Sequence, residues 1–168
     1  GALRRLAFDE LLALQVGMVA RRRQRERTRG ASIRVDDAVD HEIRAAIEGT
    51  LQRRHGRPVQ LTPDQQGAMS AIRADLASGE PMLRLLQGDV GSGKTAVAGY
   101  ALALVARSGQ QGALLAPTDL LARQHAATLR DLLAGLGLEV TLLTGSLGGE
   151  GTKAAVAAIA GGEAQVVI

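Results

Sequence analysis

The sequence predicts an α/β fold in which a parallel sheet follows an α-helical extension. Residues 1–60 are polar and helical in pattern, whereas short apolar runs alternate with helical patterns from residue 61 onward. The apolar runs lie at 82–87, 112–117, 138–144 and 164–168. Parallel strands need crossover connections long enough for a helix, so this alternation predicts a parallel sheet with helices on both faces.

The first predicted helix is amphipathic and ends near residue 29, with Gly30 closing it. Its apolar face is defined by spacings of three and four among Leu3, Ala7, Leu11, Leu14 and Met18. A second, polar-rich helix is predicted from Asp36 to about Arg54.

The stretch HGRPVQ at 55–60 breaks the helical pattern like a linker. We therefore divide the chain into a helical extension at 1–60 and the front part of an α/β domain at 61–168.

Within the α/β part, each helix has a start or stop signal. Thr62 can cap a helix over about 64–78 that has Pro63 at its first position. A helix over 94–107 ends at Ser108 and Gly109. Thr118 and Asp119 begin the next helix, and a loop and a helix are expected at about 145–160.

The composition of the chain excludes several classes of protein. The chain has 168 residues and no cysteine, which excludes disulfides and thiolate metal sites and fits a reducing compartment. Its histidines, at 41, 55 and 125, have no metal-ligand spacing. No apolar run has the length of a membrane helix, and no signal peptide is evident. We expect a cytoplasmic location and no membrane partner.

Positive charge is concentrated at the front of the chain. Its peak is RRRQRERTR at 21–29. Such a run can neutralise nucleic-acid phosphates, or it can be the solvated end of a helix, where cations suit the helix dipole. Both interpretations stay open. Phe8 and Tyr100 are the only aromatic residues, which argues against base-stacking surfaces.

One loop carries a specific chemical signal. Gly88-Asp89-Val90-Gly91-Ser92-Gly93-Lys94-Thr95 matches the pattern G-x-x-x-x-G-K-[ST], between a predicted strand and a predicted helix. Glycines let backbone N–H groups point at phosphates, and the helix start adds its positive end. Lys94 would reach the β- and γ-phosphates of ATP, and the Thr95 hydroxyl would bind Mg²⁺. The alternative is a glycine-rich turn without a ligand.

Hydrolysis needs further residues. A P-loop ATPase also uses a carboxylate at a strand end to hold Mg²⁺. None of the acids after Thr95 ends an apolar strand: Asp119, Asp131, Glu139, Glu150 and Glu163. We expect the missing aspartate beyond Ile168 and both ends of the chain to be cut from a longer protein, so this segment alone should be inactive.

Several motifs resemble a known family. LTPDQQ at 61–66, PMLRLLQGDVGSGKT at 81–95, APTDLLARQH at 116–125 and LLTGS at 142–146 together look like the first motor domain of superfamily 2 DNA helicases. With RRLAFDELLALQ at 4–15 upstream, their order resembles the RecG family of bacterial branched-DNA helicases. The transcription-repair coupling translocases share GDVG and the PT motif, but LAFDELLALQ and TGS favour the RecG family.

The resemblance implies a RecA-like P-loop NTPase fold, incomplete here, and roles for further residues. Gln65 would read the adenine; the alternative is a polar residue near a helix start. Pro117 and Thr118 would contact the DNA backbone, as would Thr144, Gly145 and Ser146. An ordinary helix cap and an ordinary turn are the alternatives for these two loops.

The resemblance also implies an activity for the parent protein, an ATP-dependent DNA helicase that remodels stalled forks and Holliday junctions in recombination and repair. Branched or fork DNA would be its partner, with contact to single-strand-binding protein in the cell, and the motor would be monomeric. The alternative from another class is a non-catalytic nucleic-acid-binding module that uses the cluster from Arg21 to Arg29.

Overall fold

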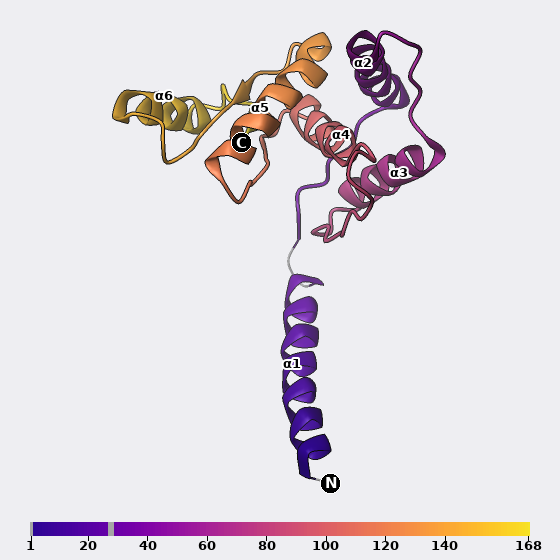
Figure 1. The fold of residues 1–168 in the computed structure, drawn as a ribbon, viewed down its shortest axis with the longest axis vertical. Helices are drawn as coiled ribbons and strands as arrows, with labels where there is room; N and C mark the ends of the chain where they lie inside the picture. Colours follow the sequence, from indigo (N-terminus) through magenta and orange to yellow (C-terminus); the bar gives the residue numbers. More distant parts are fainter. Residues whose placement is uncertain (1, 27–28) are drawn as a thin grey trace.

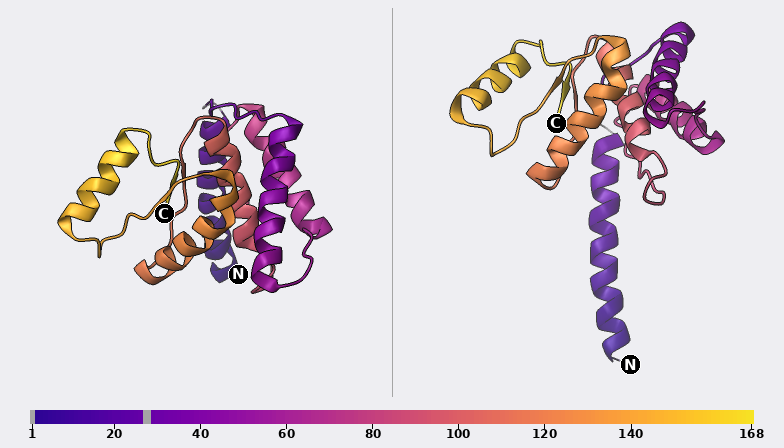
Figure 2. Two further views of the ribbon diagram at one scale, coloured as in Figure 1. Left: turned by 90° about the horizontal axis from the view of Figure 1, so that it is seen from above. Right: turned by 45° about the horizontal axis from the view of Figure 1, so that its top comes forward.

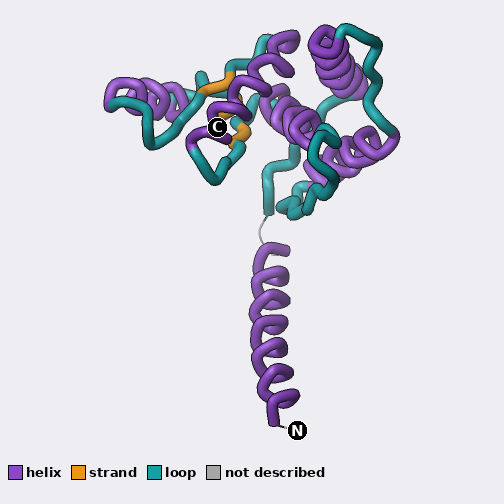
Figure 3. Tube along the Cα trace, viewed as in Figure 1, coloured by secondary structure: helices purple, strands orange, loops and turns teal. Residues whose placement is uncertain are grey.

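The computed structural model describes residues 2–26 and 29–168, and it contains a small parallel sheet among α-helices (Figures 1 and 3). In chain order the elements are α1 Ala2–Glu26, α2 Asp37–His55, α3 Pro63–Ser78, α4 Lys94–Arg107, β1 Gly112–Ala113, α5 Asp119–Leu133, the 3₁₀ helix η1 Ala134–Leu136, β2 Val140–Thr141, α6 Gly149–Ala160 and β3 Val166–Val167.

The predicted helix boundaries of α2 and α3 are confirmed by their caps. The Asp36 side chain accepts a hydrogen bond from the Val39 N–H at 2.8 Å and so caps α2. Gly56 ends α2 in the left-handed conformation, with φ 64°. Thr62 and Gln65 form a capping box at the start of α3, where each side chain accepts from the other residue's backbone N–H.

The predicted parallel sheet is confirmed, although its paired strands are short. The strand order is β1-β3-β2, with Gly112 and Val140 both in register with Val166. The chain crosses from β1 through α5 to β2, then back through α6 to β3. Since right-handed crossovers in opposite directions cover opposite faces, α5 and α6 lie on opposite sides of the strands (Figure 2).

The prediction of a strand over 82–87 is wrong. This segment has no strand pairing in the structure, and Leu83 and Leu85 are 78% and 85% exposed. A strand forms only when a neighbour supplies backbone partners, and no described segment pairs with 82–87. Apolar composition alone therefore did not determine the structure of this run.

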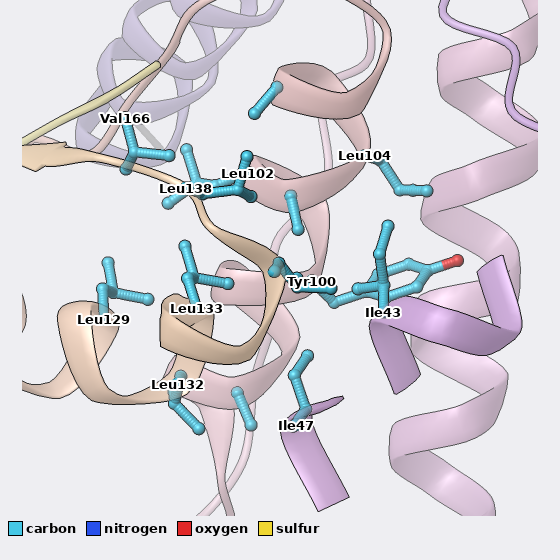
Figure 4. Close-up of a cluster of buried hydrophobic side chains, with 14 of the residues drawn as sticks. Ile43, Ile47, Tyr100, Leu102, Leu104, Leu129, Leu132, Leu133, Leu138 and Val166 are labelled. Carbon is cyan, nitrogen blue, oxygen red and sulfur yellow. The ribbon is translucent and has the colours of Figure 1, made fainter. Parts of the chain in front are cut away.

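The core lies between α4, α5 and α2 (Figure 4). Tyr100 and Leu104 of α4, Leu129 of α5, and Ile43 and Ile47 of α2 are all almost completely buried. Helix α2 therefore shares one core with the α/β part. The division of the chain at residue 60 stays a prediction.

Helix α1 extends away from the other elements (Figure 1). Leu11, Leu14 and Met18 of its predicted apolar face are exposed. The side chains of Leu3 and Ala7 lie outside what the structure describes, as do residues 27 and 28 near the predicted helix end. Amphipathic spacing thus predicted the helix, but the described part of that face contacts no core.

Candidate nucleotide-binding site

The P-loop, residues 88–95, has the backbone geometry that its glycines predict. Gly91 and Gly93 have φ values of 85° and 82°, a region that side chains with a Cβ rarely adopt. Gly93 is the N-cap of α4, and no side chain caps this helix start. The first N–H groups of α4 therefore face the loop, an arrangement suited to an anion.

Lys94 holds the loop together from within. Its ammonium donates to the carbonyl oxygens of Gly88 at 2.8 Å and Asp89 at 2.7 Å. The Ser92 N–H donates to the Asp89 carbonyl oxygen at 3.2 Å and tightens the same turn. The cation is thus held inside the loop, where phosphates would be bound.

Gln65 connects the start of α3 to the P-loop. Its side-chain Nε2 donates to the Ser92 carbonyl oxygen at 2.8 Å, while Oε1 accepts from the Thr62 N–H at 2.9 Å. A Cβ at Gly93 would overlap Gln65 Nε2, so glycine is also needed for this close approach. Both ends of the Gln65 amide are therefore used within the protein, and an adenine would have to replace these partners.

A cavity of about 410 Å³ opens between α3 and the P-loop. Gln65, Gly88, Asp89, Ser92 and Lys94 line it, with Thr62, Asp64, Ala68, Leu86, Gln87 and Val97. Its size is in the range of small-molecule sites. Among the sequence-predicted nucleotide residues, Val90 is fully exposed, and Thr95 is half-buried at the start of α4 outside the cavity lining.

A metal ion at this site would have to be held largely by the phosphates of a nucleotide. The described part of the chain contains no group of three acidic or histidine side chains that could hold a metal ion. Mg²⁺ usually binds through substrate phosphates, water and one or two protein oxygens rather than a full protein cage. The Thr95 hydroxyl, one residue after Lys94, is suited to be such an oxygen.

The two predicted DNA-backbone loops, 116–118 and 144–146, meet at one edge of the sheet. They follow β1 and β2, whose carboxyl ends point the same way because the strands are parallel. The Ser146 hydroxyl donates to Asp119 Oδ1 at 2.7 Å. Asp119 is the first residue of α5 and directly follows loop 116–118, so this bond holds loop 144–146 against the start of α5. Thr118 caps α5 by accepting from the Leu121 N–H, and Pro117 and Gly145 are exposed.

An ion pair lies at this junction. Arg123 Nε donates to Asp119 Oδ2 at 2.8 Å, and Arg123 Nη2 donates to the Ser146 oxygen at 2.8 Å. The hydrogen bond from Arg123, with those from Thr144 and Ser146, lowers the pKa of Asp119 to about 2. The carboxylate is therefore ionised at all ordinary pH values.

Three of these connections were missed in the sequence analysis. The i,i+4 spacing of Asp119 and Arg123 was a readable signal for their ion pair. The bonds from Gln65 to Ser92 and from Ser146 to Asp119 join residues far apart in the chain, and no local pattern indicates them.

The arginine cluster at 21–29 is only partly described. The side chains of Arg21, Arg23 and Arg29 are exposed, while those of the other arginines in the cluster lie outside the description. Among the described helices, none is both long and apolar enough to cross a membrane. The expected cytoplasmic location stays a prediction.

Comparison with known proteins identifies the class. Residues 62–168 match the family model of the DEAD/DEAH box helicases. The match covers more than half of the chain and contains the P-loop and both loops that follow β1 and β2. The chain belongs to the DEAD/DEAH box helicase family.

Within that class, the chain is similar to RecG proteins over nearly its whole length. It is 39% identical over 167 residues to the ATP-dependent DNA helicase RecG of Escherichia coli K12, covering 99% of this chain and 23% of that protein. It is 40% identical over 168 residues to the RecG of Bacillus subtilis, with the same two coverages. The chain thus spans about a quarter of the length of these relatives.

A solved structure agrees. The structure of RecG bound to a three-way DNA junction superimposes with a TM-score of 0.80 and 33% identity, covering 98% of this chain and 21% of that chain. The resemblance to the RecG family and the RecA-like fold are confirmed by these matches.

Proposed function

We propose that this chain is the ATP·Mg-binding front part of the first motor domain of a helicase that remodels branched DNA. The observation that supports it most is the P-loop, in which two left-handed glycines, an uncapped helix start and Lys94 border a cavity of about 410 Å³. The similar RecG proteins are named ATP-dependent DNA helicases, and one is bound to a three-way junction.

In this proposal each residue type has a chemical role. Backbone N–H groups of 88–93 hold the phosphates, and Lys94 leaves its two carbonyl partners to bind the β- and γ-phosphates. Thr95 supplies an oxygen to Mg²⁺, which neutralises phosphate charge when bound. Gln65 contacts the adenine after exchanging its bonds to Thr62 and Ser92.

Hydrolysis needs more than these groups. Asp64 and Asp89 are the acids that line the cavity, and neither Asp119 nor any later acid lines it. We therefore propose that this segment supplies nucleotide binding, while the residues that complete hydrolysis, and the strand-end carboxylate among them, belong to other parts of the parent protein.

DNA contact is the second part of the proposal. Loops 116–118 and 144–146 lie side by side, and Pro117, Thr118, Gly145 and Ser146 are exposed. Main-chain N–H groups in such loops are common phosphate donors. Branched DNA is the proposed partner of the parent protein. Its proposed monomeric state and its contact with single-strand-binding protein rest on the resemblance alone.

Two lysines allow a matched test of the nucleotide site. The chain contains Lys94 and Lys153, and Lys153 is exposed on α6, away from the cavity. Calorimetric titration with ATP·Mg should show at least about tenfold weaker binding for Lys94→Ala, because a charge-assisted bond to phosphate is lost. Lys153→Ala should bind like the parent. Equal affinity in Lys94→Ala and the parent would refute the proposal.

A further inference from the structure

A cluster of three side chains, Asp119, Arg123 and Ser146, joins the two proposed DNA-contact loops; we name it the Asp119 cluster. Asp119 accepts from both partners at 2.8 and 2.7 Å, and Arg123 also donates to Ser146 at 2.8 Å. The three bonds form a triangle, in which Asp119 and Ser146 are 27 positions apart in the chain. The triangle holds loop 144–146 against the first turn of α5, which directly follows loop 116–118.

The hydrogen-bond inventory of Arg123 leaves donors for a ligand. A guanidinium has five N–H donors, and the bonds to Asp119 and Ser146 use one on Nε and one on Nη2. Three donors are left, and the side chain is 47% exposed. Because Nη2 contacts Ser146, a phosphate bound at loop 144–146 would lie close to the guanidinium and could accept from these donors.

Arg123 compensates the negative charge of Asp119 beside the proposed phosphate-binding loops. An ionised carboxylate next to a phosphate-binding surface repels the ligand. Arg123 neutralises Asp119 through their ion pair and keeps donors for the phosphate, while Asp119 holds the guanidinium in one orientation.

We propose that Arg123 is a further DNA-phosphate contact and that Asp119 is the positioning residue that aims it at the junction of the two loops. This inference rests on the proposed DNA-backbone contact of 116–118 and 144–146. The ligand is a nucleic-acid phosphate, read without base specificity.

The test is the salt dependence of binding to a labelled three-way DNA junction, measured by fluorescence anisotropy. The logarithm of the affinity falls as the logarithm of the salt concentration rises. Arg123→Gln should make this slope less steep by about 0.9, the value for one phosphate contact. Arg84→Gln is the matched control, because Arg84 is also 47% exposed and paired with an aspartate, Asp75, away from the loops. Its slope should equal that of the parent.

Asp119→Asn tests the positioning role with the opposite charge change. Simple electrostatics predicts tighter DNA binding, because one negative charge is removed. Loss of the orienting ion pair predicts binding about threefold or more weaker. Tighter binding by Asp119→Asn would overturn the positioning role, and this variant keeps the test decisive if Arg123→Gln does not fold. ATP·Mg affinity, which depends on Lys94, checks that each variant is folded.

The outcomes separate this inference from the proposed function. If the unsubstituted chain does not bind the junction at all, the proposed DNA contact is refuted, and this inference is refuted with it. A second outcome is that the unsubstituted chain binds while Arg123→Gln keeps the same salt dependence, or while Arg84→Gln reduces the salt dependence equally. In either case only the role of Arg123 is overturned.

Discussion

Replacing Tyr100 by phenylalanine tests how firmly α2 is joined to the P-loop helix α4. Tyr100 is completely buried in α4, and its hydroxyl donates to Asp40 of α2 and accepts from Arg44 Nη2 at 3.3 Å. The Arg44 guanidinium also lies 4.9 Å from the centre of the tyrosine ring. The substitution removes the hydroxyl and leaves the ring.

The magnitude follows from the hydrogen bond to a charged group. Such a bond contributes about 1.5–3 kcal/mol, so Tyr100→Phe should lower the free energy of unfolding by that amount at neutral pH. Burial, with the hydrogen bond to Asp40, raises the pKa of Tyr100 from 10.0 to about 12. The raised pKa sets the pH window in which this contribution changes.

The pKa of Tyr100 determines how its contribution to stability changes with pH. Because the pKa of Tyr100 is raised in the folded state, its contribution is fully present below pH 10 and is lost as the pH rises from 10 to about 12. The difference in unfolding free energy between the parent and Tyr100→Phe should therefore shrink across this window.

The assay uses the fact that the chain has one tyrosine and no tryptophan. Tyrosinate absorbance then reports the titration of Tyr100 directly, in the folded chain and in urea. Urea unfolding followed by circular dichroism gives the free energies at pH 8 and pH 11. Titration of the folded chain at the ordinary tyrosine value, or a Tyr100→Phe difference that does not change with pH, would refute the reasoning.

Two further predictions concern the P-loop and the core. Gly93→Ala should weaken ATP·Mg binding at least about tenfold, because φ 82° disfavours a Cβ by about 1–2 kcal/mol and the methyl group would displace the Gln65 amide; Gly67→Ala, in open space on α3, is the calorimetric control and should bind normally. Ile47→Ala should cost about 2–5 kcal/mol in urea unfolding, because Ile47 is fully buried against the α4 and α5 core. A cost below about 1 kcal/mol would show that α2 does not share that core.

Local signals predicted the helices and the P-loop well. Caps are made by neighbouring residues, so Asp36 and Thr62 identified the starts of α2 and α3 from the sequence alone. The glycines of the P-loop were likewise readable, because positive φ at Gly91 and Gly93 excludes most other residues.

Partner-dependent features could not be predicted in the same way. The run 82–87 has strand composition but no strand pairing, because pairing depends on a neighbouring segment. The apolar stripe of α1 predicted a helix, yet Leu11 and Leu14 contact no core. The double use of the Gln65 amide depends on where Ser92 lies in space, which no spacing in the sequence encodes.

The bridge from Lys94 to the carbonyl oxygens of Gly88 and Asp89 has a thermodynamic consequence. Since the side chain is already immobilised within the turn, its rotamer entropy is lost when the protein folds and not when a triphosphate arrives. Association then exchanges one set of oxygen acceptors for another around the same ammonium group. Selectivity for phosphate over weaker anions should come from how well the incoming oxygens outcompete two main-chain carbonyls.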